Sequence, residues 1–167
     1  MKKCLLSLAL GCAAAGAAHA TNFDFSKLRY QGAPHVATKA QLRRQLGRPA
    51  RITQPNYECG WLSASEQGHP FYSLHYGLAV FTGNATDKYE LDEVKFAAGS
   101  KPLHYGPHAW NVTTTVKDLR QIFGADLQVQ PQPGGQLLVS VSTKGEDGAV
   151  FIFKDGHLAD FQHWTPC

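Results

Sequence analysis

The sequence predicts an α+β fold made of two tandem repeats, each a short helix packed on a four-stranded antiparallel sheet. Three observations predict this fold class. A segment that begins near residue 27 recurs near residue 101, each copy contains one short helix pattern, and four strand-like runs follow each helix. We expect the first repeat to span residues 21–98 and the second to span residues 99–167.

The recurrence is clearest along the two helix patterns. Thr38, Leu42 and Gly47 return 77 residues later, without a gap, as Thr115, Leu119 and Gly124. A strand-like lead precedes each set, Lys27–Gly32 in the first copy and Lys101–Gly106 in the second, and each lead runs into a Pro-His dipeptide. Matched segments in the same order indicate duplication of one supersecondary unit.

We expect a short helix in each copy, over Thr38–Leu46 and over Thr115–Phe123. In both, a threonine hydroxyl stands three residues before an acceptor side chain, Gln41 or Asp118, which is the arrangement of a capping box. A glycine directly follows each helix, where a left-handed C-cap is favoured. Helices of this length persist only when an apolar face packs on another element.

Turn signals separate the strand-like runs that follow each helix. The expected strands are Ala50–Tyr57, Phe71–Gly77, Leu78–Thr82 and Tyr89–Phe96, then Leu127–Gln132, Gln136–Thr143, Ala149–Lys154 and His157–Trp164. Asp155-Gly156 separates the last two runs and is a strong two-residue hairpin signal. Two four-stranded sheets side by side would present a broad, shallow and continuous surface.

Residues 1–20 have the pattern of a secretory signal peptide. Two lysines near the start precede a stretch of apolar and small residues, and Ala18-His19-Ala20 supplies the small residues that signal peptidase needs. We expect cleavage between Ala20 and Thr21 and a periplasmic or secreted location. The stretch is too short to remain as an anchor, so we expect no membrane span in the mature chain. The alternative is a lipoprotein modified at Cys12.

Two cysteines, Cys59 and Cys167, remain once the leader is removed. In an exported chain a pair of cysteines indicates one disulfide bond. Here the bond would tie the end of the chain to its middle. The alternative is a free thiol or a metal ligand, although neither cysteine has a partner at CxxC spacing.

The charge of the chain argues against a nucleic acid as partner. Loss of Lys2 and Lys3 with the leader lowers the formal net charge from +3 to +1. The remaining basic residues do not cluster along the sequence, whereas proteins that bind nucleic acids carry a basic patch or stripe. We therefore expect no nucleic acid partner.

No catalytic motif stands out. The sequence has no nucleophile elbow, phosphate loop or zinc-protease motif. Three histidine pairs, 104 with 108, 69 with 75, and 157 with 163, are candidates for a metal site, but none has a third ligand at motif spacing. We therefore expect surface histidines, no metal, no cofactor and no catalytic residues. A Ser-His-Asp triad stays open, because those residue types are plentiful and nothing singles one out.

Several segments resemble known families of exported proteins. The run from Phe153 to Leu158, with its continuation to Trp164, resembles the last hairpin of the β-lactamase inhibitory protein family, whose members consist of two tandem helix-plus-four-strand repeats. Outer-membrane-assembly lipoproteins of the periplasm have a related small fold. The segments Tyr57–Trp61, Tyr89–Phe96 and Thr114–Leu119 resemble exported proteins associated with immunity against toxins from neighbouring bacteria. The inhibitory proteins carry a short disulfide in each repeat, unlike this chain, and no residue role is transferred from them.

These observations together predict a non-catalytic binding protein. The resemblance implies an inhibitor or immunity protein whose partner is an envelope-targeting enzyme or toxin. Alternatives are a structural or assembly factor of the cell envelope and, third, a small hydrolase or metal-binding protein. Partner-binding residues are expected among those that share one sheet face or stand at element edges, because aromatic side chains dominate interfaces. They are Phe71, His75, Trp110, Asp160, Gln162 and Trp164, and Ser73 is expected on the sheet face of Phe71 and His75. The alternative is that the tryptophans close the edges of a small core.

Overall fold

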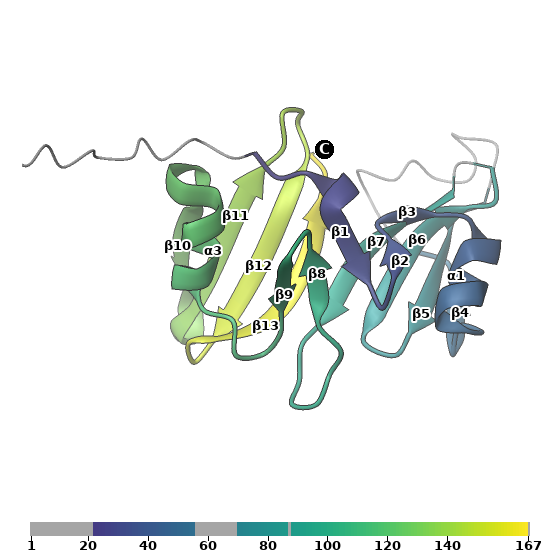
Figure 1. Ribbon diagram of the computed structural model, residues 1–167, viewed down its shortest axis with the longest axis horizontal. Coiled ribbons are helices and arrows are strands. Elements are labelled where there is room, and N and C mark those ends of the chain that lie inside the picture. The colour runs from purple at the N-terminus through teal and green to yellow at the C-terminus, as the bar shows by residue number, and fades with distance from the viewer. Residues whose placement is uncertain (1–21, 56–69, 87, 167) are drawn as a thin grey trace, which may run out of the picture.

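The computed structural model describes residues 22–55, 70–86 and 88–166. Within these residues the chain forms an α+β fold of two antiparallel sheets and two α-helices (Figure 1). The expected leader, its cleavage site after Ala20 and both Cys59 and Cys167 lie outside the described residues, so the export signal and the disulfide stay predictions.

The first half of the chain has a short hairpin, the short strand β3, a helix and four strands, and the second half has a short hairpin, a helix and four strands. Its first-half elements are β1 (Leu28–Tyr30), β2 (Ala33–Pro34), β3 (Val36–Ala37), α1 (Lys39–Leu46), β4 (Arg51–Thr53), β5 (Tyr72–Tyr76), β6 (Ala79–Asn84) and β7 (Lys88–Lys95). Its second-half elements are β8 (Leu103–Tyr105), β9 (His108–Trp110), α3 (Val116–Phe123), β10 (Gln128–Gln132), β11 (Gln136–Ser142), β12 (Gly148–Lys154) and β13 (His157–Trp164).

One sheet contains the four-strand runs of both halves. Its strand order is β10-β11-β12-β13-β7-β6-β5-β4, and β3 pairs with part of β7. The two runs join where Phe161 of β13 lies opposite Val94 of β7 in an antiparallel pair. The two expected four-stranded sheets are therefore hydrogen-bonded to each other and form one continuous large sheet.

The two strand-like leads form a second, small sheet that was not expected as a separate layer. Its order is β2-β1-β8-β9, so the lead of the first half pairs directly with that of the second. In this pairing Leu28 lies opposite Tyr105 and Tyr30 lies opposite Leu103.

Both helices begin as the capping pattern predicts. The Gln41 N–H donates to the Thr38 hydroxyl, and the Thr38 N–H donates to the Gln41 side-chain oxygen at 2.8 Å. Thr115 and Asp118 exchange the same pair of bonds in α3. The expected left-handed C-cap is wrong in detail, because Gly47 combines φ 84° with ψ −151°, outside the left-handed helical region.

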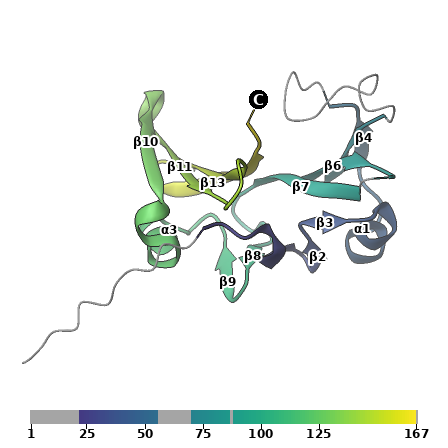
Figure 2. The same cartoon turned by 90° about the horizontal axis from the view of Figure 1, so that it is seen from above.

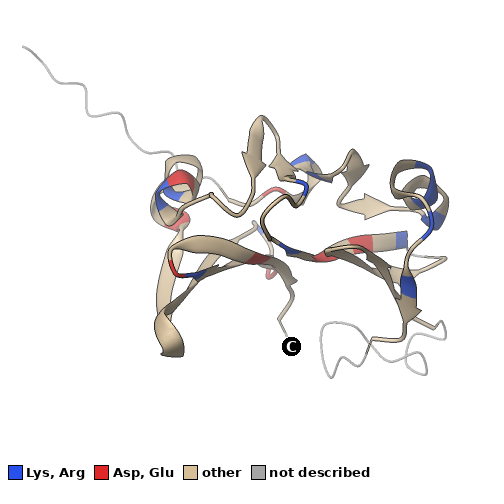
Figure 3. Cartoon of the chain, turned by 90° about the horizontal axis from the view of Figure 1, so that it is seen from below, with Lys and Arg blue, Asp and Glu red and all other residues tan. Residues whose placement is uncertain are grey.

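The two faces of the large sheet differ. Helices α1 and α3 and the small sheet all lie against one face (Figure 2). The opposite face carries no helix within the described residues. It is the concave face of the curved sheet, as Figure 3 also shows. We call this surface the outer face, because it points away from the helices and the small sheet.

The core fills the space between the large sheet and the layer of helices and small sheet. It contains the buried side chains of both helices, among them Leu42, Leu119 and Phe123. A cluster of aromatic rings lies beside α3 and joins the two sheets. Its members are Phe23, Tyr105, Trp110, Phe123, Phe151 and Phe161.

Candidate functional site

One row of residues crosses the outer face from edge to edge. Each member lies opposite the next in the hydrogen-bonded register of neighbouring strands, so their side chains share this face. The row is Gln128, Ser140, Val150, Gln162, Glu93, Val80, His75 and Arg51. Six of its eight side chains are polar and two are valines, and such a mixed surface is able to bind a protein.

Most of the predicted binding residues lie on this outer face. His75 and Gln162 belong to the row, and Asp160 and Trp164 flank Gln162 at alternate positions of β13. Ser73 is on the same face of β5 but is buried, where its hydroxyl lies 3.0 Å from that of Thr82. The fold thus places side chains from β5 and β13 on one face of the sheet, with β6 and β7 between the two strands.

Trp110 does not belong to this surface. Its side chain is only 2% exposed, stacks on Tyr105 at a centroid distance of 5.1 Å and meets the edge of Phe151 at 5.1 Å. The interpretation of Trp110 as a binding residue is therefore wrong, because the aromatic cluster of the core encloses it. Phe71, which precedes β5, is also buried.

A β-bulge corrects the predicted faces of the last strand. Simple alternation places Leu158 on the same face as Asp160, but Leu158 is fully buried. The register changes between Ile152 and Phe153, so Ala159 is an extra residue on β13. The bulge turns Leu158 and Phe161 toward the core and leaves Asp160 on the outer face.

Two carboxyl groups lie near each other in the middle of the outer face. Asp160 is opposite Lys95, and the neighbouring pair brings Gln162 opposite Glu93. Burial, reinforced by the negative charge of Glu93, raises the pKa of Asp160 to about 7. Lys95 lies 3.2 Å from Glu93 and offsets part of that charge. This centre of the face is therefore polar, and its charge depends on pH.

The outer face has different chemistry at its β4 edge and at the end of its central strand β13. At the β4 end, His75 lies 3.3 Å from Arg51 and 2.9 Å from the Thr53 hydroxyl, and burial with the Arg51 charge lowers the pKa of His75. At the end of the central strand β13, Trp164 is 48% exposed. It borders a cavity of about 270 Å³ whose apolar lining includes Leu138 and Val150.

A second group of interacting residues lies between the two sheets, around His35. The His35 N–H donates to the Leu28 carbonyl at 3.2 Å, and the His35 carbonyl accepts from the Leu91 N–H at 2.8 Å. Leu28 belongs to the small sheet and Leu91 to the large sheet, so the backbone of His35 bridges the two. Its side chain is 96% buried with neither ring nitrogen hydrogen-bonded within the described residues, and its ring stacks on that of Phe25.

His163 and two carboxylates lie next to His35. The ring centroids of His35 and His163 are 5.1 Å apart. His163 Nδ1 is 3.6 Å from Glu90 Oε2, and His163 Nε2 is 3.6 Å from Asp147 Oδ2. We call His35, Glu90 and His163 the histidine cluster. The expectation that His163 is a surface histidine is wrong, because its side chain is only 7% exposed.

Burial sets the protonation of this cluster. Burial and the nearby His163 lower the pKa of His35 to about 3, so its imidazole is neutral at pH 7. Burial raises the pKa of Glu90, and His163 opposes that rise. The other predicted histidine pairs do not form such a cluster: His104, His108 and His157 are exposed, and His69 lies outside the described residues.

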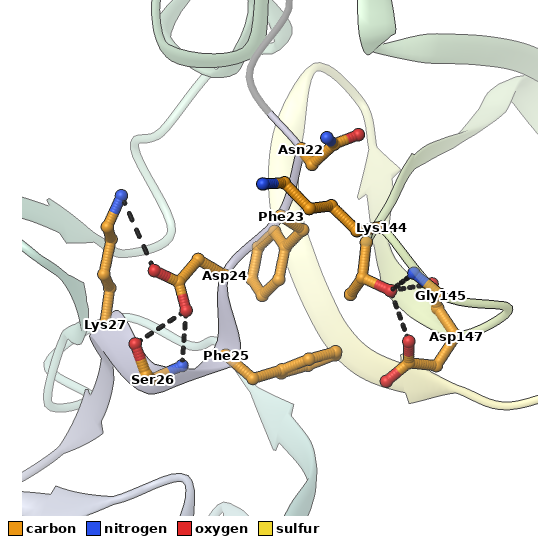
Figure 4. A pocket seen from close by; sticks show the side chains of 10 residues that line it. Asn22, Phe23, Asp24, Phe25, Ser26, Lys27, Lys144, Gly145 and Asp147 are labelled. Carbon is orange, nitrogen blue, oxygen red and sulfur yellow. Dashed lines mark hydrogen bonds and ion pairs between the residues drawn. The ribbon is translucent and has the colours of Figure 1, made fainter.

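A cavity opens on the Asp147 side of the histidine cluster. Its volume is about 640 Å³, and it lies between the N-terminal segment 22–27 and the loop that joins β11 to β12 (Figure 4). Phe25 points toward the loop, and Asp24 accepts bonds from Ser26 on the opposite rim. The Thr143 hydroxyl donates to Asp147, which fixes this carboxylate beside His163.

Known proteins offer no template for the outer face or for the histidine cluster. The chain matches no family model, no curated protein and no solved structure. Within the described residues, no helix is both long enough and apolar enough to cross a membrane. The function must therefore be inferred from the outer face and the histidine cluster.

Proposed function

We propose that the chain consists of two copies of one unit, residues 21–98 and 99–167. The order hairpin, helix and four strands in each half supports this proposal. So does the arrangement of the strands, since the last strand of each half, β7 or β13, lies at the centre of the large sheet and the first, β4 or β10, lies at an edge. Joining two units in this way doubles the width of the outer face.

The outer face is, in our proposal, the surface by which this protein binds another protein. The observation that carries the proposal is the edge-to-edge row of mixed side chains on a sheet face that bears no helix from the described part of the chain. Trp164 beside an apolar cavity supplies the kind of aromatic residue that dominates binding energy in interfaces. Asp160, Gln162 and Glu93 supply polar groups beside it.

The chemistry of this face indicates which groups its partner presents. Apolar side chains of the partner would cover Trp164 and the cavity that Leu138 and Val150 line. Basic or hydrogen-bond-donating groups would lie over Asp160 and Glu93, because two neighbouring carboxyl groups at the centre favour donors. With a mature net charge near +1, long-range steering is weak and affinity depends on fit.

We place this partner among enzymes or toxins that act in the cell envelope, so that the protein is an inhibitor or immunity protein. The signal-peptide pattern supports an envelope location, and the resemblance to exported inhibitory and immunity proteins supports blocking as the role. The proposal involves no catalytic residue of this chain.

The test is to identify one partner and measure its binding. The mature chain is used to capture proteins from periplasmic extracts, the captured protein is purified, and the pair is titrated by calorimetry. We expect a one-to-one complex and loss of the activity of the captured enzyme at one equivalent. Trp164→Ala should weaken binding by about 2 kcal/mol or more.

Arg120→Ala is the matched control, because Arg120 is exposed on α3, on the opposite side of the large sheet. It should bind as tightly as the unmodified chain. A partner that binds Trp164→Ala and the unmodified chain equally would contradict the outer face as the interface. A partner that binds there and keeps its activity would contradict the inhibitor role and favour an assembly factor.

A further inference from the structure

Three side chains from distant parts of the sequence meet between the two sheets. His35 follows β2, Glu90 is in β7 and His163 is in β13, and each offers one ligand atom within 4.8 Å of the other two. We propose that the histidine cluster binds one divalent transition-metal ion, with Zn²⁺ as the best fit, and that this ion links the small sheet to the large sheet.

The state of His35 is the first argument. A buried polar atom without a hydrogen bond costs free energy, and two such atoms on one ring call for an explanation. Both ring nitrogens of His35 are in this position within the described residues, on a side chain 96% buried. Nδ1 or Nε2 of a neutral imidazole is a common ligand for zinc, and coordination would satisfy one of them.

The ligand set is the second argument. Two imidazoles with one carboxylate make up a known zinc-binding combination, whereas Ca²⁺ and Mg²⁺ prefer oxygen ligands only. Zinc ligands lie about 2.0–2.2 Å from the metal and thus about 3.3–3.6 Å from each other in a tetrahedral site. Glu90 Oε2 and His163 Nδ1 are already 3.6 Å apart. The ligand atom of His35 lies within 4.8 Å of the other two.

The carboxylate behind His163 is the third argument. Metal-binding histidines almost always donate their other ring N–H to a carboxylate, carbonyl or water, which fixes the tautomer and the ring. If Nδ1 of His163 binds the metal, Nε2 faces Asp147 Oδ2 at 3.6 Å. Asp147 is itself held by the Thr143 hydroxyl. The cluster therefore has the supporting group that a metal site requires.

A cavity lies next to the site. Its volume is about 320 Å³ and it is bordered by Phe25, Arg29 and His35, so a modest movement of these side chains would open the imidazole to an ion. Once bound, the ion would be covered by the Phe25 ring, whose centroid is 4.3 Å from that of His35 and 4.4 Å from that of His163. A covered ion between two sheets favours a structural role.

The test uses the full mature chain after removal of metal by a chelator. Zn²⁺ is titrated by calorimetry, and Co²⁺ is titrated with its visible absorption as a reporter of coordination. We expect one equivalent to bind, tetrahedral-type absorption from Co²⁺ and a rise in melting temperature with Zn²⁺ that the chelator reverses. Absence of saturable binding at one site would overturn the proposal, and the cluster would then be a proton-linked ion-pair network.

Variants locate the site. His35→Phe keeps an aromatic ring against Phe25 and removes the ligand, and Glu90→Gln keeps the shape of the side chain. Each should weaken Zn²⁺ binding by about tenfold or more, as should Asp147→Asn. His75→Phe, which changes a histidine of the outer face, should bind as the unmodified chain does. Equal binding by Glu90→Gln and the unmodified chain would overturn the assignment.

Two further measurements cover the remaining alternatives. The double variant Cys59→Ser with Cys167→Ser should keep its Zn²⁺ affinity, and loss of binding in this variant alone would move the site to the cysteines. If His35→Phe and Glu90→Gln fail to fold, nitrogen spectra of the histidine rings in the unmodified chain decide the question. Zn²⁺ should shift the rings of His35 and His163, and shifts confined to other histidines would overturn the proposal.

Discussion

Arg29 of β1 lies opposite His104 of β8 at the centre of an antiparallel pair. On one side of this pair Leu28 lies opposite Tyr105, and on the other Tyr30 lies opposite Leu103. The two leads that match in sequence thus pair with each other, and each buried leucine lies opposite a buried tyrosine. The small sheet connects the two halves through identical residue types.

The pairing of Tyr30 with Leu103 should appear as an energetic coupling between the two halves. Leu103→Ala should lower the free energy of unfolding by about 2–5 kcal/mol, since it leaves a cavity. Tyr30→Ala with Leu103→Ala should be less destabilising than the sum of the two, by about 0.5–1 kcal/mol or more. Urea unfolding of the four proteins measures this coupling. Strict additivity would show that the two residues do not interact.

Helix α3 should depend more on its buried face than on its cap. Thr115→Ala removes the hydroxyl that accepts from the Asp118 N–H and should cost about 1 kcal/mol. Leu119→Ala empties a fully buried position and should cost about 2–5 kcal/mol. Denaturant unfolding compares the two. A smaller loss for Leu119→Ala than for Thr115→Ala would contradict the assigned core face.

Substitution of buried Trp110 should destabilise the protein far more than substitution of exposed Trp164. Trp110→Ala removes the centre of the aromatic cluster and should lower the free energy of unfolding by about 3–5 kcal/mol. Trp164→Ala alters an exposed side chain at the end of β13 and should change it by about 0.5 kcal/mol or less. Thermal and urea unfolding give both values. Similar losses for the two variants would contradict the separation of core from outer face.

Asp160 should make stability fall as the pH rises from about 4 to about 7. Its pKa is raised in the folded protein from 3.8 to about 7, so the folded state holds the proton more tightly than the unfolded state. This contribution is complete below pH 4 and is lost as the pH passes 7. Asp160→Asn removes this contribution. As the pH rises, the free energy of unfolding of the variant should therefore increase relative to that of the unmodified chain by on the order of 1–2 kcal/mol. Solvent screening at this partly buried group keeps the effect small.

Urea unfolding at several values from about pH 4 to about pH 9 tests this dependence. The difference between Asp160→Asn and the unmodified chain should grow with pH and level off above pH 8. Glu146→Gln, at an exposed position of the loop before β12, should follow the unmodified chain at every pH. A constant difference for Asp160→Asn would show that burial does not raise this pKa.

Local chemistry explains what the sequence predicts well. The capping boxes at Thr38 and Thr115 depend on residues three positions apart, and both are confirmed. Asp155-Gly156 needs positive φ at both positions, and the angles are 51° and 77° between the paired residues Lys154 and His157. Seven of the eight predicted strands match observed strands closely; Ala50–Tyr57 is a strand only over Arg51–Thr53 in the described residues.

Long-range geometry explains what it does not predict. Nothing near Val94 or Phe161 in the sequence indicates that these residues lie opposite each other. The pairing of β7 with β13, which joins the two runs of strands, therefore cannot be predicted from the sequence. The bulge at Ala159 reverses the face of Leu158 without any glycine or proline to mark it.

The histidine cluster is hidden for the same reason. His35, Glu90 and His163 have no motif spacing, because they meet only after both sheets have formed. The Pro-His dipeptide is a partial signal, although its two occurrences differ: His35 is buried, whereas His108 is exposed.

The pairing of β7 with β13 also sets an order of events during folding. Residues Glu93–Lys95 of the first half have their strand partner in Asp160–Gln162, near the end of the chain. Contacts between such distant segments form late and slow the folding of a domain. While the chain is synthesised from its N-terminus, this stretch of β7 therefore stays an unpaired edge until β13 is made, and the first half alone cannot complete its sheet.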